Sequence, residues 1–346
     1  MSAKKDKPIE FLYLTQEEVK TAGGADMKMV VDAVEEVLKL HALNKVNVPP
    51  KTVLDLGEKT RGRINSMPAY VGGDMDVCGI KWIASFPANP QKYGIPRATG
   101  LIILTDSWKG VPLAIMDGTL ISAMRTGAVT GVAAKYMARK DSETVAMIGC
   151  GVQARTQLSA LKTVLPGIKT VKGYDPNMAT AERYAKDMIT QFGINAKATE
   201  TAKEAVTGAD IIVTVTVADE PIVKNAWVKE GSFFCHVGSY QEEEYEVVLN
   251  SQKRFVDDWE QVEHRGTSVL AKMYKEGKLK KEDLTGTIGD AIIGKIKGRD
   301  NDKQRIFCEP IGMGSEDVAV GFRVYKKSLQ KKLGQKLRLW TKPELS

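Results

Sequence analysis

Residues 145–156 read VAMIGCGVQART, a short apolar run that enters two closely spaced glycines and continues into a stretch compatible with a helix. Gly149, Gly151 and Ala154 form the pattern G-x-G-x-x-A, a permitted variant of the dinucleotide-binding fingerprint. The first glycine allows a tight turn, the second lets a pyrophosphate approach the backbone, and the alanine lets the helix pack close to the strand. By itself the pattern is a weak signal, because strand-to-helix loops without a ligand also use glycine to turn.

The segments around this turn favour the interpretation as a nucleotide site. The pattern predicts strands at 144–149, 170–175, 210–216, 232–239 and 254–258, and helices at 153–165, 179–193 and 201–209. Strands that alternate with helices are typical of a parallel sheet with crossover connections. We therefore expect a Rossmann-type domain, with the pyrophosphate at the N-terminus of the helix that follows the turn.

Asp175 ends the second predicted strand, where the fingerprint places an acid for the ribose hydroxyls. A carboxylate there would repel a 2′-phosphate, and no arginine follows it directly. NAD is therefore the expected cofactor, with NADP less favoured.

The first 120 residues have a different pattern. Three apolar pieces, 65–73, 79–87 and 98–118, resemble parts of hairpins, and the turn DSWKG lies between two apolar runs. Residues 121–139 are rich in small side chains and predict a linking helix. The tail after Glu309 predicts another helix, which we expect to pack back on the first domain. The fold class is therefore α/β, with an α+β domain beside the Rossmann-type domain.

Composition limits the classes of function. The chain has 346 residues, 43% of them hydrophobic, which fits a globular protein of two domains. No apolar run approaches the roughly 20 residues of a membrane helix, and the start MSAKKDKPIE lacks the apolar core of a signal peptide. The net charge is +7, but no recognition motif accompanies the lysines, so neither a nucleic acid nor a membrane is an expected partner.

The four cysteines lie far apart, and three of them sit in apolar runs. We interpret these three as small buried side chains, which fits a reducing, cytoplasmic setting. The sequence contains no CxxC pair, and we predict no metal site.

Several longer motifs carry a resemblance to a known family. They are MPAYVGG (67–73), GIKWIASFPANP (79–90), PLAIMDGTLISAMRTGAVTGVAAKYMA (112–138), IGCGVQART (148–156) and IGMGSEDVAV (311–320). Together, in this order from about residue 10 to 335, they resemble the ornithine cyclodeaminase/mu-crystallin family. The resemblance implies a homodimer with a substrate-binding and dimerisation domain at 1–135 and 309–346, and a Rossmann NAD-binding domain at 136–308.

The resemblance also implies roles for two cations. Arg125 matches the arginine that holds the substrate carboxylate close to the nicotinamide, and Lys81 matches the active-site lysine. A guanidinium can hold a carboxylate with two parallel hydrogen bonds, and a desolvated lysine can exchange protons. The alternatives are an arginine paired with a structural acid and a strand lysine that points to solvent.

Further contacts follow from the same resemblance. Val152 and Gln153 match residues along the pyrophosphate, and Ile311 matches an apolar substrate contact. Cofactor contacts at the carboxyl edge of the sheet match Thr216, Val237, Gly238 and Ser239.

Three positions depart from the cyclodeaminases. This chain has Lys51 where cyclodeaminases have an arginine that helps to bind the substrate carboxylate. It has Asn65 where they have a glutamate that binds a distal amino group of the substrate. It has Tyr240 where they have an aspartate that is proposed to carry a proton. One of the glutamates 242–244 could substitute for the missing acids, but a run of glutamates more often forms a solvated loop.

Three functions follow from these residues. The first is an NAD-dependent oxidoreductase acting at the α-carbon of an amino acid or cyclic imino acid, in which Lys81 or Tyr240 manages the proton. The second is ornithine cyclodeaminase, with NAD recycled in each turnover, which Asn65 and Tyr240 weaken. The third is a nucleotide- or small-ligand-binding protein of the mu-crystallin type. It is disfavoured because folding needs neither Lys81 nor Arg125.

Overall fold

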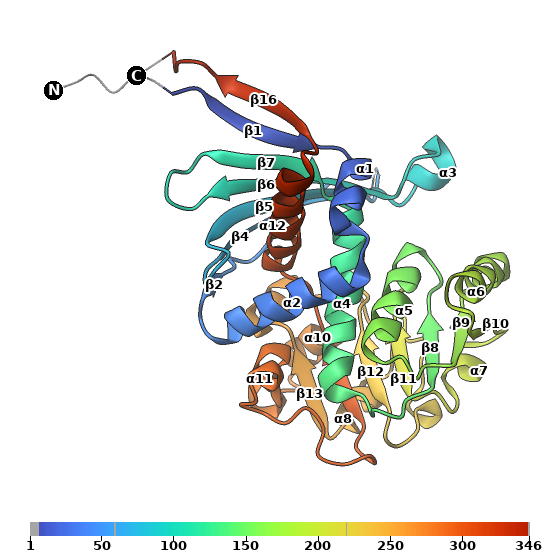
Figure 1. Cartoon of the computed structure of the whole chain (residues 1–346). Coiled ribbons are helices and arrows are strands. Elements are labelled where there is room, and N and C mark those ends of the chain that lie inside the picture. The colour runs from blue at the N-terminus through green and yellow to red at the C-terminus, as the bar shows by residue number, and fades with distance from the viewer. Residues whose placement is uncertain (1–6, 59, 219, 345–346) are drawn as a thin grey trace. The chain divides into compact units, whose positions relative to one another are not determined.

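The computed structural model describes residues 7–58, 60–218 and 220–344 (Figure 1). Contacts between residues divide the chain into two compact units. Unit 1 comprises Met1–Ala33, Leu43–Arg125 and Met313–Ser346, and unit 2 comprises Val34–Ala42 and Thr126–Gly312. The α/β fold class is confirmed. The substrate-binding and NAD-binding domains expected at 1–135 with 309–346 and at 136–308 remain predictions.

Unit 2 contains an eight-stranded parallel sheet, sheet B, with the order β10-β9-β8-β11-β12-β15-β13-β14. Its strands are β8 (Thr144–Ile148), β9 (Thr170–Tyr174), β10 (Asn195–Ala198), β11 (Ile211–Thr214), β12 (Phe233–His236), β13 (Lys253–Val256), β14 (Gly286–Thr287) and β15 (Ile306–Glu309). All five predicted strands of this region are present. The strand order reverses between β8 and β11, and ligands of open parallel sheets bind at such a switch point.

Helices cover both faces of sheet B. They are α5 (Val152–Val164), α6 (Met178–Phe192), α7 (Ala202–Val206), α8 (Tyr245–Leu249), α9 (Trp259–Arg265), α10 (Val269–Lys275) and α11 (Ile288–Ile292), with 3₁₀ turns at Asn225–Trp227 and Lys281–Asp283. On one face, Ile148 and Ile212 pack with Val206, Val247 and other apolar residues in one cluster. The alternate residues of β8 and β11 are buried as well. Burial on both faces explains the continuous apolar strands in the sequence.

Helix α4 (Thr119–Met137) explains the small residues predicted to form a linking helix. A Cβ on Gly127 would lie 2.4 Å from the carbonyl oxygen of Thr156, and a Cβ on Gly131 would lie 2.9 Å from the Cβ of Ala160. Glycine at these two positions therefore allows α4 to approach α5 closely.

Unit 1 contains a second sheet, sheet A, with the order β16-β1-β7-β6-β5-β4-β2 and with β3 also paired to β4. Its strands are β1 (Ile9–Leu14), β2 (Val46–Asn47), β3 (Thr52–Asp55), β4 (Arg63–Val71), β5 (Val77–Ser85), β6 (Ala98–Asp106), β7 (Pro112–Asp117) and β16 (Gln335–Trp340). The pairs β4–β5 and β6–β7 are antiparallel, which confirms the predicted hairpins.

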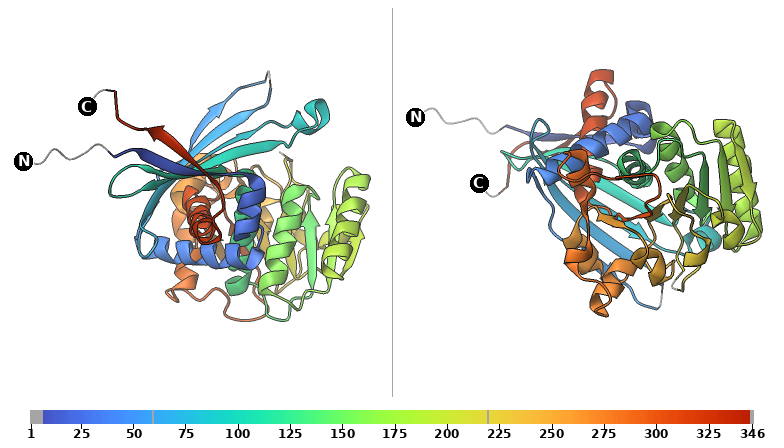
Figure 2. Two further views of the ribbon diagram at one scale, coloured as in Figure 1. Left: turned by 45° about the horizontal axis from the view of Figure 1, so that its top comes forward. Right: turned by 90° about the horizontal axis from the view of Figure 1, so that it is seen from below.

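Helix α12 (Gly314–Lys331) lies against β4, β5 and β6 of the same unit (Figure 1 and Figure 2). A Cβ on Gly79 would lie 2.9 Å from a side-chain carbon of Val318, so α12 and β5 approach closely there. This confirms that the C-terminal tail is helical and packs on the first part of the chain. The other elements of unit 1 are α1 (Gln16–Val19), a π-helical turn (Lys20–Gly24) and α3 (Asn89–Tyr93). Helix α2 (Met27–Ala42) begins in unit 1, and its residues from Val34 on belong to unit 2.

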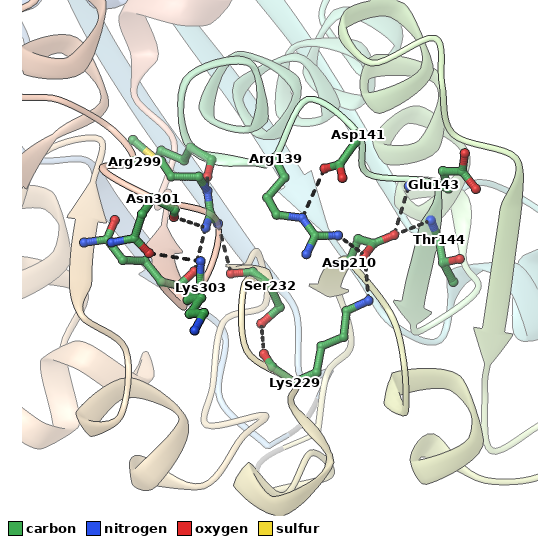
Figure 3. Close-up of polar contacts among 12 residues, drawn as sticks. Arg139, Asp141, Glu143, Thr144, Asp210, Lys229, Ser232, Arg299, Asn301 and Lys303 are labelled. Atoms are coloured by element: carbon green, nitrogen blue, oxygen red, sulfur yellow. Dashed lines mark hydrogen bonds and ion pairs between the residues drawn. The ribbon is translucent and has the colours of Figure 1, made fainter.

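The amino ends of β8 and β11 are joined by a network of charges around Asp210 (Figure 3). Asp210 pairs with Arg139 at 2.8 Å and with Lys229 at 2.6 Å. Its second oxygen accepts hydrogen bonds from the backbone N–H groups of Glu143 and Thr144, both at 2.9 Å. Through these contacts the Asp210 carboxylate links the segments before β8 and β11 at the amino edge of sheet B.

Two predictions from composition can be compared with the structure. No helix among the described residues is long and apolar enough to cross a membrane. Cys150, Cys235 and Cys308 are buried free thiols, as expected of cysteines in apolar runs.

Candidate active site

The glycine turn after β8 has the geometry that the fingerprint predicts. Gly149 has φ +94°, and a Cβ there would lie 2.9 Å from the carbonyl oxygen of Val215. Gly151 is the N-cap of α5, and a Cβ there would meet no heavy atom of the described residues within 4 Å. Open space thus lies before the first turn of a 13-residue helix, and its N-cap, a glycine, has no side chain that could cap the first N–H groups. A pyrophosphate fits this arrangement, because helix N-termini offer free N–H groups to anions.

Asp175 lies beside this turn, directly after β9. One carboxylate oxygen accepts a hydrogen bond from the backbone N–H of Cys150 at 3.1 Å, and the other accepts from Asn177 at 3.0 Å. The residue is partly exposed. Its assignment to the cofactor remains a prediction.

Arg155 also supports the turn, and the sequence analysis did not identify it. Its Nη1 donates to the carbonyl oxygens of Cys150 at 3.2 Å and Gly151 at 3.0 Å. Its Nε donates to the carboxylate of Asp187 on α6 at 3.1 Å. The spacing of four residues between Gly151 and Arg155 is one helical turn, and this spacing could have indicated the contact.

The carboxyl ends of β11 and β12 bring other predicted cofactor contacts together. Thr216 and Gly238 both donate their backbone N–H groups to the carboxylate of Glu242, at 2.5 Å and 3.1 Å. The carbonyl oxygen of Ser239 accepts from the hydroxyl of Thr267 at 2.7 Å. Val237 precedes these residues, and its backbone N–H donates to Thr214 at 2.8 Å. On α5, Val152 is exposed and Gln153 partly exposed beside the glycine turn.

The expectation that residues 242–244 form a solvated loop is wrong. Glu242 and Glu243 are fully buried, as is His236 at the end of β12. Nδ1 of His236 lies 3.0 Å from an oxygen of Glu243. Burial disfavours the imidazolium, but the neighbouring carboxylates Glu243 and Glu242 raise the pKa of His236 to about 10. Two glutamates that look like surface residues in the sequence therefore belong to a buried ion-pair cluster.

This cluster is also a candidate metal group, because ligand atoms of His236, Glu242 and Glu243 lie within 4.8 Å of one another. Both oxygens of Glu242 accept backbone N–H groups, however, and His236 is oriented toward carboxylates as a cation would be. This set of contacts fits an internal ion pair, and we assign no metal to it.

The loop that follows β15 is held in a similar way. Asp257, fully buried at the end of β13, accepts the backbone N–H groups of Ile311 at 3.1 Å and Gly312 at 2.5 Å. Ile311, the predicted apolar substrate contact, is partly exposed, and so is Tyr240 in the loop between β12 and α8. These contacts fix the backbone at Ile311, and the roles of both side chains remain predictions.

Unit 1 holds Lys81 on β5, with its side chain 1% exposed. Its Nζ lies 2.7 Å from Oδ2 of Asp317 and donates to the hydroxyl of Ser122 at 3.1 Å. The alternative of a lysine pointing to solvent is therefore wrong. Burial and the neighbouring Arg125 lower the pKa of Lys81 to about 8, against the opposing effect of Asp317. A lysine in this range can both bind an anion and exchange a proton near neutral pH.

Arg125, on α4, is buried in the same unit and pairs with two acids. Its Nη1 lies 2.7 Å from an oxygen of Glu316, and its Nε lies 3.3 Å from Oδ1 of Asp317. Both acids are fully buried in the first turn of α12. The alternative of an arginine paired with acids is therefore confirmed for these contacts. Arg125 and Lys81 share the carboxylate of Asp317.

Two further predicted substrate residues belong to this unit. Lys51 is buried, directly before β3. Asn65 lies on β4 two residues before Met67, which is the register partner of Lys81. Alternate residues of a strand share a face, so Asn65 lies on the Lys81 face of sheet A.

Comparison with known proteins completes the description. The model of the ornithine cyclodeaminase/mu-crystallin family matches residues 12–332. The chain is 36% identical to an N-((2S)-2-amino-2-carboxyethyl)-L-glutamate dehydrogenase from Staphylococcus aureus, over 96% of this chain and 99% of the relative. It is 39% identical to an alanine dehydrogenase from Archaeoglobus fulgidus, again over 96% and 99%.

Two solved structures are similar over nearly the whole chain. A Δ1-pyrroline-2-carboxylate reductase from Thermococcus litoralis, in complex with NADH and L-proline, has a TM-score of 0.87 and 35% identity over 94% of this chain and 99% of that one. An archaeal alanine dehydrogenase dimer with bound NAD has a TM-score of 0.86 and 37% identity over 96% of this chain and 100% of that one.

Proposed function

This chain belongs to the ornithine cyclodeaminase/mu-crystallin family, and we propose that it is an NAD-dependent oxidoreductase acting at the α-carbon of an amino acid or cyclic imino acid. The observation that carries this proposal is the buried pair of cations, Lys81 and Arg125, which share the carboxylate of Asp317. Two cations fixed side by side provide a site for the α-carboxylate that amino acids and cyclic imino acids have in common.

The proposed mechanism assigns substrate binding to residues of unit 1. Arg125 and Lys81 bind and orient the substrate carboxylate, and Lys51 adds a third cation near the substrate. When bound, the nicotinamide supplies or accepts the hydride at the α-carbon. Lys81, with a pKa of about 8, exchanges the proton that accompanies hydride transfer, and Tyr240 is the second candidate for this role. Positioning of the two reactants supplies most of the rate acceleration.

The cofactor assignment rests on the glycine turn of unit 2. The backbone from Gly149 to Gln153 would hold the pyrophosphate. The carboxylate of Asp175 would accept hydrogen bonds from the ribose hydroxyls and would repel a 2′-phosphate. At the ends of β11 and β12, the other proposed cofactor contacts are Thr216, Val237, Gly238 and Ser239. Arg125 contacts the cofactor as well in this proposal.

Asn65 favours net redox chemistry over cyclodeamination. It shares the Lys81 face of sheet A, where a neutral amide cannot form an ion pair with a distal ammonium group. Ile311, with its apolar side chain, would line the substrate. A substrate with an uncharged side chain, or a cyclic imine, therefore fits these residues best.

The face of sheet A that carries Trp82 supports a proposed homodimer. Trp82 and Leu101 are register partners on β5 and β6 and are 41% and 40% exposed. Tyr70 on β4 is exposed as well. An exposed apolar sheet face of this kind is typical of a protein interface, and we propose a second copy of the chain as its partner. A cytoplasmic location remains a prediction from the cysteines.

The test is a substrate panel with the full-length protein. Ornithine, lysine, alanine and arginine would be supplied with NAD or NADP, and the corresponding cyclic imines with NADH, while NADH absorbance and ammonia are recorded. We expect NADH to form with ammonia from an amino acid, or to be consumed by an imine. Ammonia from ornithine without net NADH would indicate a cyclodeaminase. Bound NAD without turnover of any substrate would favour a mu-crystallin-like binding protein.

A substitution of Arg125 tests whether this residue binds the substrate carboxylate. Arg125→Ala should lower kcat/KM by roughly a hundredfold or more, because it removes a buried anchor of the substrate. Arg338→Ala, an exposed arginine on β16 of the same unit, is the matched control and should keep wild-type activity. Full activity of Arg125→Ala on every accepted substrate would contradict the assignment.

A further inference from the structure

Glu242 is a fully buried carboxylate between two strand ends of unit 2. One oxygen accepts the backbone N–H of Thr216, two residues after β11, and the other accepts the backbone N–H of Gly238, two residues after β12. The N···O distances are 2.5 Å and 3.1 Å. Since β11 and β12 are neighbouring parallel strands, a single side chain bridges two adjacent strand ends.

Gly238 and Glu242 fit each other sterically. A Cβ on Gly238 would lie 2.0 Å from an oxygen of Glu242, so a side chain at position 238 would displace the carboxylate. The backbone of Gly238 does not have the positive φ that usually calls for glycine. The close approach of the carboxylate is therefore the physical reason for glycine at this position.

His236 supplies the positive charge that a buried carboxylate needs. Its Nδ1 lies 3.5 Å from Glu242 and 3.0 Å from Glu243. Both glutamates and the histidine have fully buried side chains. An isolated buried carboxylate would be costly, whereas a carboxylate beside an imidazolium and two N–H donors can stay ionised. Glu242 thus has two N–H donors and an imidazole around its carboxylate.

We propose that Glu242 is a positioning residue for the dinucleotide: its carboxylate fixes the spacing between the ends of β11 and β12, on which the cofactor rests. In this assignment Glu242 touches neither cofactor nor substrate and acts through Thr216 and Gly238. The inference rests on the proposed function, because that function makes these two residues cofactor contacts. It adds a residue that the resemblance did not assign.

Glu242→Gln tests the bridge with almost no change in size. The amide keeps one acceptor and replaces the other with a donor, which would face a backbone N–H. We expect the Kd for NADH, measured by fluorescence titration, to rise about tenfold. The KM for the amino or imino acid at saturating NADH should stay unchanged, and the emission spectrum of bound NADH should shift. Glu246→Gln, an exposed glutamate on α8, is the matched control and should behave as wild type.

Two more variants keep the test decisive. Glu242→Asp retains the carboxylate beside His236, but the shorter side chain does not extend to both backbone N–H groups. This variant serves as the test if Glu242→Gln does not fold. Gly238→Ala places a Cβ against the carboxylate and should raise the Kd for NADH in the same direction.

The outcomes separate this inference from the function it rests on. A folded Glu242 variant whose Kd for NADH stays within twofold of wild type overturns the inference while NAD-dependent activity stands. A rise in the KM for the amino or imino acid without a change in the Kd for NADH overturns it as well. Failure of the wild-type protein to bind NADH overturns the proposed function and this inference with it.

Discussion

At the scale of single residues, the centre of unit 1 is a set of four buried charges. Lys81 and Arg125 are the cations, and Glu316 and Asp317 at the start of α12 are the anions. A lone buried charge costs several kcal/mol, so each cation depends on the acids for its place. The acids also lie in the first turn of a helix, where the macrodipole favours negative charge. Helix α12 therefore fixes the orientation of both proposed substrate-binding cations.

The lowered pKa of Lys81 predicts an alkaline limit of activity. The ammonium is needed to bind the carboxylate and is lost as the pH rises through about 8. We expect kcat/KM for reduction of the imino acid, which needs the ammonium both to bind the carboxylate and to donate the proton, to fall above that pH by about tenfold per unit at the steepest. Lys81→Arg should lower kcat, because a guanidinium cannot exchange the proton, and should move the alkaline limit of substrate binding to higher pH, because a guanidinium stays protonated. A pH–rate profile of wild type and variant measures the effect.

Asp317→Asn and an exposed lysine provide the controls. Asp317 raises the pKa of Lys81, so its neutral isostere should shift the alkaline limit to lower pH. Lys109→Arg, at an exposed turn of the same unit, should leave the profile unchanged. A wild-type profile that stays flat to pH 10 would contradict the role given to Lys81.

At the scale of elements, carboxylates hold the carboxyl edge of sheet B. The Asp175 carboxylate binds the glycine turn after β8, Glu242 joins the ends of β11 and β12, and Asp257 binds the loop after β15. Glu309, at the end of β15, accepts the backbone N–H of Leu270 at 3.0 Å. Burial raises the pKa of Glu309 to about 7. Backbone N–H groups of loops need acceptors when they are buried, and side chains at strand ends supply them here.

The turn after β8 should not tolerate a side chain at its first glycine. In Gly149→Ala the alanine would keep φ +94° and bring its Cβ 2.9 Å from the carbonyl oxygen of Val215. We expect a loss of about 1–3 kcal/mol in the free energy of unfolding, from strain and contact together. The Kd for NADH should rise as well. Denaturant unfolding and NADH titration measure the two effects.

Gly208→Ala separates the two causes. Gly208 has φ +80°, but its added Cβ would meet no heavy atom of the described residues within 4 Å. This control should therefore lose about 1 kcal/mol from backbone strain and keep the wild-type Kd for NADH. Equal effects of the two substitutions on both measurements would show that the close contact at Val215 does not matter.

At the scale of the whole molecule, each unit has its own sheet and its own buried core. In unit 2 the sheet is buried on both faces, whereas in unit 1 α12 covers one face of β4–β6. The other face of sheet A exposes Trp82 and Leu101. Unit 1 therefore has an apolar surface that a second copy of the chain can cover.

Charges on this face should prevent assembly. Trp82→Lys combined with Leu101→Lys replaces two apolar register partners with like charges, so we expect the proposed dimer to give way to monomer. Light scattering after gel filtration measures the molar mass. Trp108→Lys is the control, since Trp108 is 86% exposed at the turn between β6 and β7. A doubly substituted protein that keeps the wild-type mass would rule out this face as the interface.

The sequence by itself determined five strands of sheet B, three of its helices, the hairpin strands of sheet A and the helices α4 and α12, in the order in which they follow. Alternating apolar strands and amphipathic helices predicted the parallel sheet, and the glycine pattern located the turn after β8. These signals are local, because hydrophobic periodicity and turn chemistry act over a few residues. The hairpins of sheet A and the C-terminal helix were predicted for the same reason. Helices α2 and α8 to α11 and strands β1, β15 and β16 were not predicted.

Only the tertiary structure decided which charges meet. Arg125 and Glu316 are 191 positions apart, so no local pattern could pair them. Glu242 and Glu243 look like a solvated run in the sequence, but both are buried beside the ends of β11 and β12. There His236 lies next to both carboxylates, and backbone N–H groups donate to Glu242. Burial and ion pairing depend on where distant segments pack. The sequence therefore located the candidate site, and packing decided how its charges are held.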